Sequence, residues 1–368
     1  MPSIASSQKV TEAAAYDPFA RGRFPVGVRT IEALDGARDR VFPCEIWYPA
    51  AAEHTGQDLA PETQDSFAIR AAPPWRPRDV TRSQSAVRNA AAHPGKYPLV
   101  IFSHHSGGHR RAATFLHTHL SSHGYVIAAL DHSEVVAREL HGREGETPEQ
   151  LAARGEAWIA NRVPDIRFLL DHLRGGAEKN ADATRVGIAG HSFGGWTALA
   201  APDVEPRIRA VVALAPAGSS NPKPGVIPAK LGFNWGRDVP TLLLAAENDV
   251  SLPLDGMHEI HKRTPASKRM VILRRADHLH FVDDVEEAHE SGRKLLLERK
   301  ELAHIAEAMR PIGELCSGEQ AHVFVRGLTL CHMDAILKGQ EDARRFIEGD
   351  IEAELAARGV EVMVHKSA

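Results

Sequence analysis

Residues 185–200 read RVGIAGHSFGGWTALA, in which a short apolar run passes through a glycine-rich corner into a helix-forming segment. The apolar run predicts a buried strand, and the segment after it predicts a helix. Glycines at 190, 194 and 195 allow strand and helix to approach closely, and a serine at such a corner holds its hydroxyl exposed. The N-terminus of the helix also favours negative charge nearby. The pattern therefore predicts Ser192 as a nucleophile, and the alternative is a serine that only caps the helix.

Similar apolar runs recur on both sides of this corner. We expect buried strands at 98–104, 125–131, 185–190, 208–216, 240–249 and 269–278, with helices at about 110–122 and 159–175. The runs are apolar throughout rather than alternating, which is typical of parallel strands covered on both faces. The fold class is therefore α/β, with a mostly parallel central sheet and helices on both faces.

The rest of the chain is expected to belong to the same single domain or to segments added to it. Residues 26–47 predict two strands around a turn at Asp35-Gly36, and they begin a single domain over 26–368. The expected additions are an N-terminal arm (1–25), an insertion (50–96), two segments that could cover the site (132–158 and 216–238) and a helical C-terminal extension (282–368).

Composition narrows the class of protein. The chain has 368 residues, 43% of them hydrophobic and 25% charged, as in globular proteins. Lys and Arg number 44 against 48 for Asp and Glu, so charge gives no reason to expect nucleic acid as a partner. No apolar run is long enough to predict a membrane span, and residues 1–20 lack the pattern of a signal peptide.

The cysteines indicate a compartment. Cys44, Cys316 and Cys331 are odd in number and lack C-x-x-C spacing, which argues against a zinc site or a disulfide framework. They fit a reducing environment, so we expect the cytoplasm, and a single bridge between two of them stays open.

A serine nucleophile needs a general base and a carboxylate that orients the base. Asp249 and His278 each follow a predicted strand, and with Ser192 they give the chain order Ser, Asp, His. The carboxyl ends of parallel strands meet at one edge of a sheet. We therefore predict Ser192, Asp249 and His278 as a catalytic triad.

Two of these roles have rivals nearby. Glu247 is the rival acid, although it lies nearer the strand interior, and His280 is the rival base, two residues beyond His278. Asp277 is a poor candidate for the acid, because a carboxylate rarely points at the imidazole next to it in the chain. Each residue alone could be a solvated loop residue, and it is the order of the three that favours catalysis.

An oxyanion hole would complete the site. One donor should be the backbone N–H of Phe193, and the second should come from the glycine-containing loop after the first buried strand. We predict the N–H of Ser106, with that of His105 as second choice. The histidines 104, 105 and 109 suggest a metal alternative, but such loops more often pack and hydrogen bond, so we predict no metal.

Two longer stretches resemble a known group. They are RVGIAGHSFGGWTALA and PLVIFSHHSGGHRRAATFLHTHLSSHGYVIAALDH (98–132). The second combines a histidine- and glycine-containing loop with an SHGY strand. Together they resemble the α/β-hydrolase superfamily, and more narrowly the platelet-activating-factor acetylhydrolase and predicted dienelactone hydrolase-like group, over residues 25–50 and 97–282. Dienelactone hydrolases proper use a cysteine nucleophile, so that substrate does not carry over to a chain with Ser192.

The resemblance implies a carboxylic-ester hydrolase that forms an acyl-enzyme, needs no cofactor and takes a small-molecule ester. A lactone, an amide, a polyester chain or acyl transfer to an alcohol is the alternative with the same triad. A non-catalytic binding protein on this fold is the least favoured reading.

Substrate contacts are predicted from position. His105 and His191 flank the predicted donors and nucleophile, while Phe233 and Trp235 look like an exposed aromatic pair among prolines and glycines in 216–238. A surface loop packed on itself is the alternative for that segment. The helical tail could also pack against a second copy in a homodimer.

Overall fold

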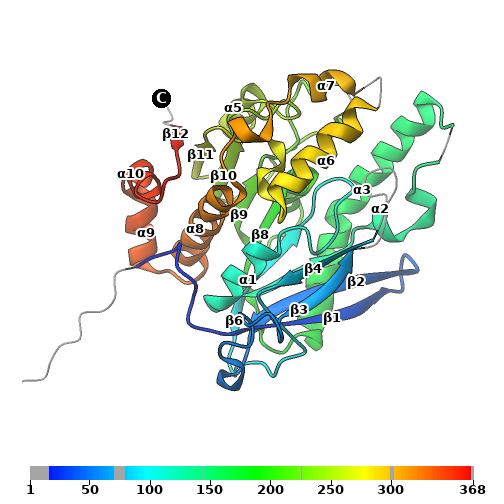
Figure 1. Ribbon diagram of the computed structural model, residues 1–368. Helices are drawn as coiled ribbons and strands as arrows, with labels where there is room; N and C mark the ends of the chain where they lie inside the picture. The colour runs from blue at the N-terminus through cyan, green and yellow to red at the C-terminus, as the bar shows by residue number, and fades with distance from the viewer. Residues whose placement is uncertain (1–15, 70–78, 144, 225, 299–301, 366–368) are drawn as a thin grey trace, which may run out of the picture.

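A ten-stranded sheet runs through the molecule in the order β12-β11-β10-β9-β8-β6-β7-β2-β1-β5 (Figure 1). The computed structural model describes residues 16–69, 79–143, 145–224, 226–298 and 302–365. The strands are β1 Val26–Asp35, β2 Arg40–Pro49, β5 Val87–Arg88, β6 Tyr97–Ser103, β7 Val126–Leu130, β8 Ala181–His191, β9 Ile208–Leu214, β10 Thr241–Ala246, β11 Lys268–Leu273 and β12 Val362–His365.

The centre of the sheet is parallel. Strands β7, β6, β8, β9, β10 and β11 pair in parallel with their neighbours, whereas β2 and β12 join the two ends of this block antiparallel. The expected α/β class with a mostly parallel sheet is confirmed. Ser103 at the end of β6 is in register with Gly190 of β8, so the loops after these strands leave the same edge side by side.

Helices cover both faces of the sheet. They are α1 Thr114–Ser122, α2 Ser133–Val136, α3 Pro148–His172, α4 Phe193–Ala200, α5 Leu254–Arg263, α6 Val285–Leu297, α7 Ala303–Ala308, α8 Gly318–Leu337, α9 Glu341–Glu348 and α10 Ile351–Ala356. Alternate residues of a strand point to opposite faces. In β6, Val100 and Phe102 join the core under α1 and α8, while Leu99 and Ile101 join the core under α3, α4 and α5.

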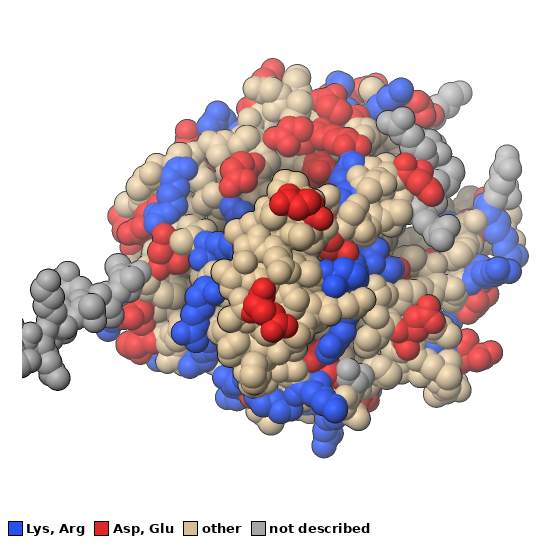
Figure 2. Space-filling model, turned by 60° about the horizontal axis from the view of Figure 1, so that its bottom comes forward, with Lys and Arg blue, Asp and Glu red and all other residues tan. Residues whose placement is uncertain are grey.

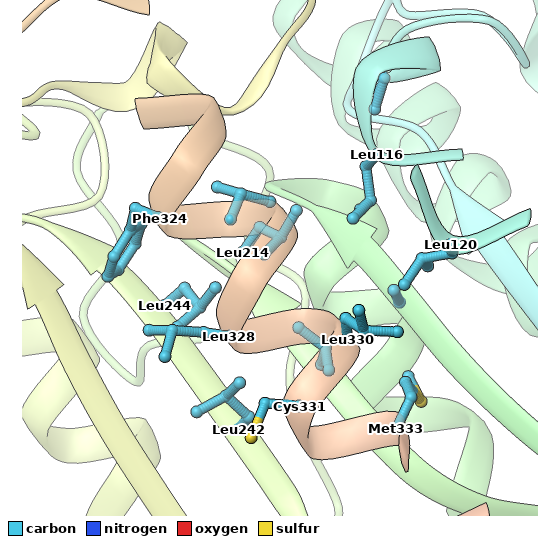
Figure 3. Packing of buried hydrophobic residues seen from close by; sticks show 14 of the residues in the cluster. Leu116, Leu120, Leu214, Leu242, Leu244, Phe324, Leu328, Leu330, Cys331 and Met333 are labelled. Atoms are coloured by element: carbon cyan, nitrogen blue, oxygen red, sulfur yellow. The ribbon is translucent and has the colours of Figure 1, made fainter. Parts of the chain in front are cut away.

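Helix α8 is a core element rather than a peripheral extension. Figure 3 shows Phe324, Leu328 and Cys331 of α8 facing Leu214 of β9 and Leu244 of β10. The C-terminal region thus packs against the sheet through α8. Its expected helical character is incomplete, because residues 362–365 form β12 and pair antiparallel with β11.

The insertion is more ordered than its composition suggested. Strands β3 Asp65–Ile69 and β4 Val80–Gln84 form a separate antiparallel pair, and β5 adds a short parallel edge beside β1. Residues 70–78 of the insertion lie outside the described residues.

Of the N-terminal arm (1–25), the structure describes residues 16–25, and this part is bound to the α1 region. Its backbone carbonyls at Pro18 and Ala20 accept hydrogen bonds from His119 (3.0 Å) and His123 (2.9 Å) of the α1 region. The Phe24 N–H donates to the Ser122 carbonyl at 3.0 Å. The segment is therefore tied to α1 by hydrogen bonds at both ends, and residues 1–15 lie outside the described residues.

Cysteine state and surface character complete the outline. Cys44, Cys316 and Cys331 are buried and unpaired. In the described part of the chain, no helix is both long and apolar enough to cross a membrane. Acidic and basic side chains are interspersed over the face drawn in Figure 2, and neither sign covers it.

Candidate active site

Ser192 stands at a strained corner between β8 and α4. Its φ of 59° and ψ of −116° are uncommon for a residue with a side chain. Glycine is required on either side because the backbones nearly touch: a Cβ on Gly194 would lie 1.9 Å from the Ser103 carbonyl oxygen, and one on Gly190 would lie 2.2 Å from the Gly194 oxygen. The corner thus presents the serine at the sheet edge.

The structure brings Ser192, His278 and Asp249 together. His278, which opens the turn after β11, has its Nε2 2.9 Å from the Ser192 Oγ, and its Nδ1 lies 2.6 Å from the Asp249 Oδ2. The second Asp249 oxygen accepts the backbone N–H groups of Ser251 (2.9 Å) and Leu252 (2.8 Å), which fixes the carboxylate. The Asp249 side chain is 1% exposed and that of His278 is 19% exposed. Of these two side chains, the imidazole is therefore the one that contacts solvent.

The charge around His278 suits a base. Because the Asp249 carboxylate can only accept, the imidazole carries its proton on Nδ1 and turns the Nε2 lone pair to the Ser192 hydroxyl. Burial lowers the pKa of His278, but the Asp249 carboxylate outweighs burial, and the pKa stands above its ordinary value. A positive charge formed on this ring would therefore be stabilised.

The rival residues belong to other networks. Asp277 Oδ1 lies 2.9 Å from His280 Nδ1, and His280 Nε2 donates to the Cys316 carbonyl at 3.1 Å. Burial lowers the pKa of His280, yet the hydrogen bond to Asp277 raises it to about 9, so the two form a buried ion pair. Glu247 accepts the N–H of Arg275 at 2.9 Å. Neither Asp277 nor Glu247 hydrogen bonds to the His278 ring, whose Nδ1 lies 2.6 Å from Asp249.

The two predicted oxyanion donors lie on adjacent segments. Phe193 is the first residue of α4, and Ser106 lies exposed in the loop after β6. Within the described part of the chain, neither backbone N–H donates to another protein group. A helix N-terminus and a loop with free N–H groups can together bind a developing negative charge.

The histidines of this loop are engaged in hydrogen bonds. His104 donates from Nδ1 to the His105 carbonyl at 2.7 Å and accepts the His132 N–H on Nε2 at 3.2 Å. Both ring nitrogens of His104 are therefore used inside the protein. Among the described residues, no group of three or more His, Cys, Asp or Glu side chains is arranged to hold a metal ion.

His191 packs against His278 on the buried side of the site. It is 1% exposed, its ring centroid lies 4.8 Å from that of His278, and its Nε2 donates to the His278 carbonyl at 2.9 Å. Burial and the neighbouring His278 lower the pKa of His191, so it stays neutral. His105, 5.4 Å from the His191 ring, lies on the solvent side.

The picture of Phe233 and Trp235 as an exposed aromatic pair is wrong. Trp235 is 5% exposed and donates to the Leu199 carbonyl near the end of α4 at 3.2 Å. Phe233 packs edge-on against it, under the guanidinium of Arg263. Apolar burial explains this: the indole fills the core beside α4, at the opposite end of that helix from Ser192.

Sequence reasoning missed the groups behind the β6 loop. Arg162 of α3 is fully buried, and with Glu134, His132 and Asp165 it forms a polar network against Ser103 and His104. A signal exists in the sequence: Arg162 stands at a core position of the periodicity that continues at Ile166 and Leu169. A charged residue at a core position indicates that a buried partner of opposite charge exists. The pattern does not identify that partner.

Comparisons with known proteins agree with the architecture. Residues 79–162 match the family model of platelet-activating factor acetylhydrolase, isoform II. The guinea pig (Cavia porcellus) platelet-activating factor acetylhydrolase is 26% identical over 226 residues, 51% of this chain and 49% of that protein. Cutinase est1 of Thermobifida alba is 23% identical over 192 residues, 51% of this chain and 55% of that protein. The chain thus spans about half the length of the curated relatives it matches.

A solved structure matches over nearly the whole chain. The ferulic acid esterase from Streptomyces cinnamoneus superposes with a TM-score of 0.63 and 24% identity, covering 94% of this chain and 98% of that one. The structural likeness therefore covers far more of the chain than the sequence matches do. With the parallel sheet and the Ser192 corner, this likeness shows that the chain has the α/β-hydrolase fold.

Proposed function

We propose that this protein is a serine hydrolase that cleaves carboxylic esters through an acyl-enzyme. The observation that carries the proposal is the hydrogen-bonded line from Ser192 through His278 to Asp249, with distances of 2.9 and 2.6 Å, at a strained strand-to-helix corner. The relatives it matches bear the names of an acetylhydrolase, a cutinase and a ferulic acid esterase, which supports ester hydrolysis as the reaction class.

The proposed mechanism follows from these groups. The Ser192 Oγ attacks the ester carbonyl while its proton passes to His278 Nε2. The N–H groups of Phe193 and Ser106 bind the oxyanion, and Asp249 stabilises the imidazolium. His278 then gives its proton to the leaving alcohol, and water repeats the sequence to release the acid. No step requires a metal or an organic cofactor.

The substrate region is proposed to extend along the sheet edge beside Asp249. A cavity of about 450 Å³ there is lined by Asp249, Val250 and Leu254, with Ile305 of α7 and Lys223 of the segment 216–238. The segment therefore borders this edge through Lys223 rather than through its aromatic pair. His105, which is half-buried with its ring 5.4 Å from that of His191, stays a candidate for substrate contact, whereas the burial of His191 argues against the same role for that residue.

The cellular compartment and the oligomeric state are separate proposals. The unpaired state of all three buried cysteines supports a reducing compartment, and we infer the cytoplasm. A homodimer stays a prediction.

The test is hydrolysis of p-nitrophenyl esters, acetyl through dodecanoyl, by the wild type and by Ser192→Ala. We expect Ser192→Ala to abolish turnover while the wild type shows a chain-length optimum. A fluorophosphonate probe should label the wild type at Ser192 and leave the variant unlabelled. A folded wild type that hydrolyses no ester would overturn ester hydrolysis. Probe labelling would then favour a lactone, amide or polymer substrate, or acyl transfer, whereas no labelling would favour a binding protein.

A further inference from the structure

One buried guanidinium contacts two carbonyls of the loop that carries the second oxyanion donor, and it also contacts the last residue of β6, before that loop. Arg162 of α3 is 0% exposed. Its Nη1 donates to the His104 carbonyl at 2.6 Å and to the Ser103 Oγ at 3.2 Å, and its Nη2 reaches the His105 carbonyl at 3.4 Å. Nη2 also pairs with Glu134, which balances the charge inside the protein.

These contacts decide where the loop's N–H groups point. The His105 carbonyl and the Ser106 N–H belong to one peptide unit, and in a planar trans peptide they point in opposite directions. The His105 carbonyl accepts from Arg162, from the His104 ring at 2.7 Å and from the Gly108 N–H at 3.0 Å. With this carbonyl held inward, the Ser106 N–H is turned outward, toward the sheet edge. Arg162 likewise holds the His104 carbonyl inward, which turns the His105 N–H of the same peptide unit outward.

The same guanidinium also touches the residue that carries the first donor. It lies over the Phe193 ring, 4.3 Å from the centroid. Phe193 follows Ser192 directly, and Gly194 packs against the Ser103 and His104 carbonyls. Arg162 thus lies between the two segments whose spacing would set the width of an oxyanion hole.

A second side chain of α3, Asp165, stabilises the start of the loop through His132. Asp165, one turn further along the helix, has its Oδ2 3.1 Å from His132 Nδ1, and His132 Nε2 accepts from the Ser103 hydroxyl at 2.8 Å. The hydrogen-bonded series Ser103–His132–Asp165 resembles a catalytic triad. Because Ser103 is fully buried and out of reach of a substrate, we infer that this series stabilises the end of β6.

We propose that Arg162 is a positioning residue for the oxyanion hole: by holding the His104 and His105 carbonyls inward, it aims the Ser106 N–H at the reacting carbonyl. The inference rests on the proposed ester hydrolysis and adds to it a group that never touches substrate. It implies that loss of Arg162 harms the transition state more than the bound substrate.

The test compares Arg162→Lys with the double variant Arg162→Met/Glu134→Gln, which removes both buried charges together. Arg88→Met is the matched control, since Arg88 pairs with the buried Glu45 and Asp65 but contacts neither donor segment. For each protein, kcat and KM are measured on p-nitrophenyl butyrate, with the fluorophosphonate-titrated site concentration and the inhibition constant of a boronic acid that forms a tetrahedral serine adduct.

We expect the double variant to lose about 10²- to 10³-fold in kcat, as when an oxyanion donor is removed, with KM changed less than about threefold. Boronic acid affinity should fall in parallel, Arg162→Lys should recover part of kcat, and Arg88→Met should keep wild-type kcat. A purely structural role would lower the titratable fraction and leave kcat per site unchanged, and that result overturns the proposal. So does a Lys variant with wild-type kcat and boronic acid affinity, should the double variant fail to fold. If the wild type itself hydrolyses no ester, the proposed function has failed rather than this inference.

Discussion

At the scale of single residues, the proposed mechanism depends on the carboxylate of Asp249, whose side chain is 1% exposed. Asp249 is held by two backbone N–H groups and directs its free oxygen to His278. Its charge both selects the Nδ1-protonated ring and keeps the pKa of that ring above the ordinary value. Orientation and electrostatics are therefore coupled through a single hydrogen bond.

We predict that Asp249→Asn lowers kcat by about 10⁴-fold, the loss found for this change in a comparable triad, because the amide favours the wrong tautomer. The base works only when neutral, so wild-type activity should fall as pH drops through the raised pKa of His278. In the variant that acid limb should move to lower pH. Rates on p-nitrophenyl acetate from pH 5 to 9 measure both effects.

Asp39→Asn is the control for this change. Asp39 is an exposed carboxylate in the turn between β1 and β2, and it does not line the cavity beside Asp249. It should leave the rate and the acid limb unchanged. A rate for Asp249→Asn within tenfold of wild type, with the same pH profile, would show that another group orients His278.

Each of the three residues of the proposed triad has a local signal in the sequence, whereas the sequence does not show which groups the buried Arg162 contacts. Ser192 stands in a glycine corner, and Asp249 and His278 follow apolar strands. Arg162 acts on a loop 58 residues away in the chain, a relation that only the packing of α3 creates. Trp235 misled for the same reason: its flanking glycines and prolines suggested exposure, but tertiary contacts bury it.

At the scale of elements, α3 and β12 show where local patterns were insufficient. The helix expected from residue 159 begins at Pro148, because Thr147 and Gln150 form a reciprocal cap and Pro148 occupies the first turn. Pro164 lies inside the same helix. Strand β12 spans only four residues after a run of helices, so its pairing with β11 decides it rather than its own propensity.

Helix α8 provides the test at this scale. Leu328 is fully buried against the strands, so Leu328→Ala should reduce the free energy of unfolding by about 2–5 kcal/mol. Leu151→Ala, in which the leucine is 55% exposed on α3, should change it by less than about 0.5 kcal/mol. Urea unfolding followed by circular dichroism measures both, and kcat per titrated site should stay at the wild-type value. Equal effects of the two changes would mean that α8 does not belong to the core.

At the scale of the whole molecule, buried histidines tie stability to pH. His117, between the rings of Trp47 and Phe102, is fully buried, and burial lowers its pKa to about 3. Burial likewise lowers the pKa of His332 to about 4. Burial also lowers the pKa values of His104 and His191. The fold thus holds several neutral imidazoles that would bind protons readily once exposed.

The direction of the pH effect follows from proton binding. Below the ordinary histidine pKa of about 6.5, the unfolded chain takes up protons at these positions while the folded chain does not. Stability should therefore fall as pH decreases from about 6.5 toward 4. His280 acts in the opposite sense, since its pKa is raised to about 9, but its contribution is already complete below 6.5 and does not change the slope there.

We predict that the free energy of unfolding falls between pH 6.5 and 4.5 with a slope of more than one proton, each proton contributing about 1.4 kcal/mol per pH unit. His117→Met should remove about one proton from that slope, because an apolar side chain fills the site between Trp47 and Phe102 without titrating. His141→Met, a change at an exposed histidine, is the control and should leave the slope as in wild type. Urea titrations at four pH values measure the slopes. Since His117 has no hydrogen-bond partner among the described residues, a slope for His117→Met equal to wild type would mean that its ring is protonated in the folded state.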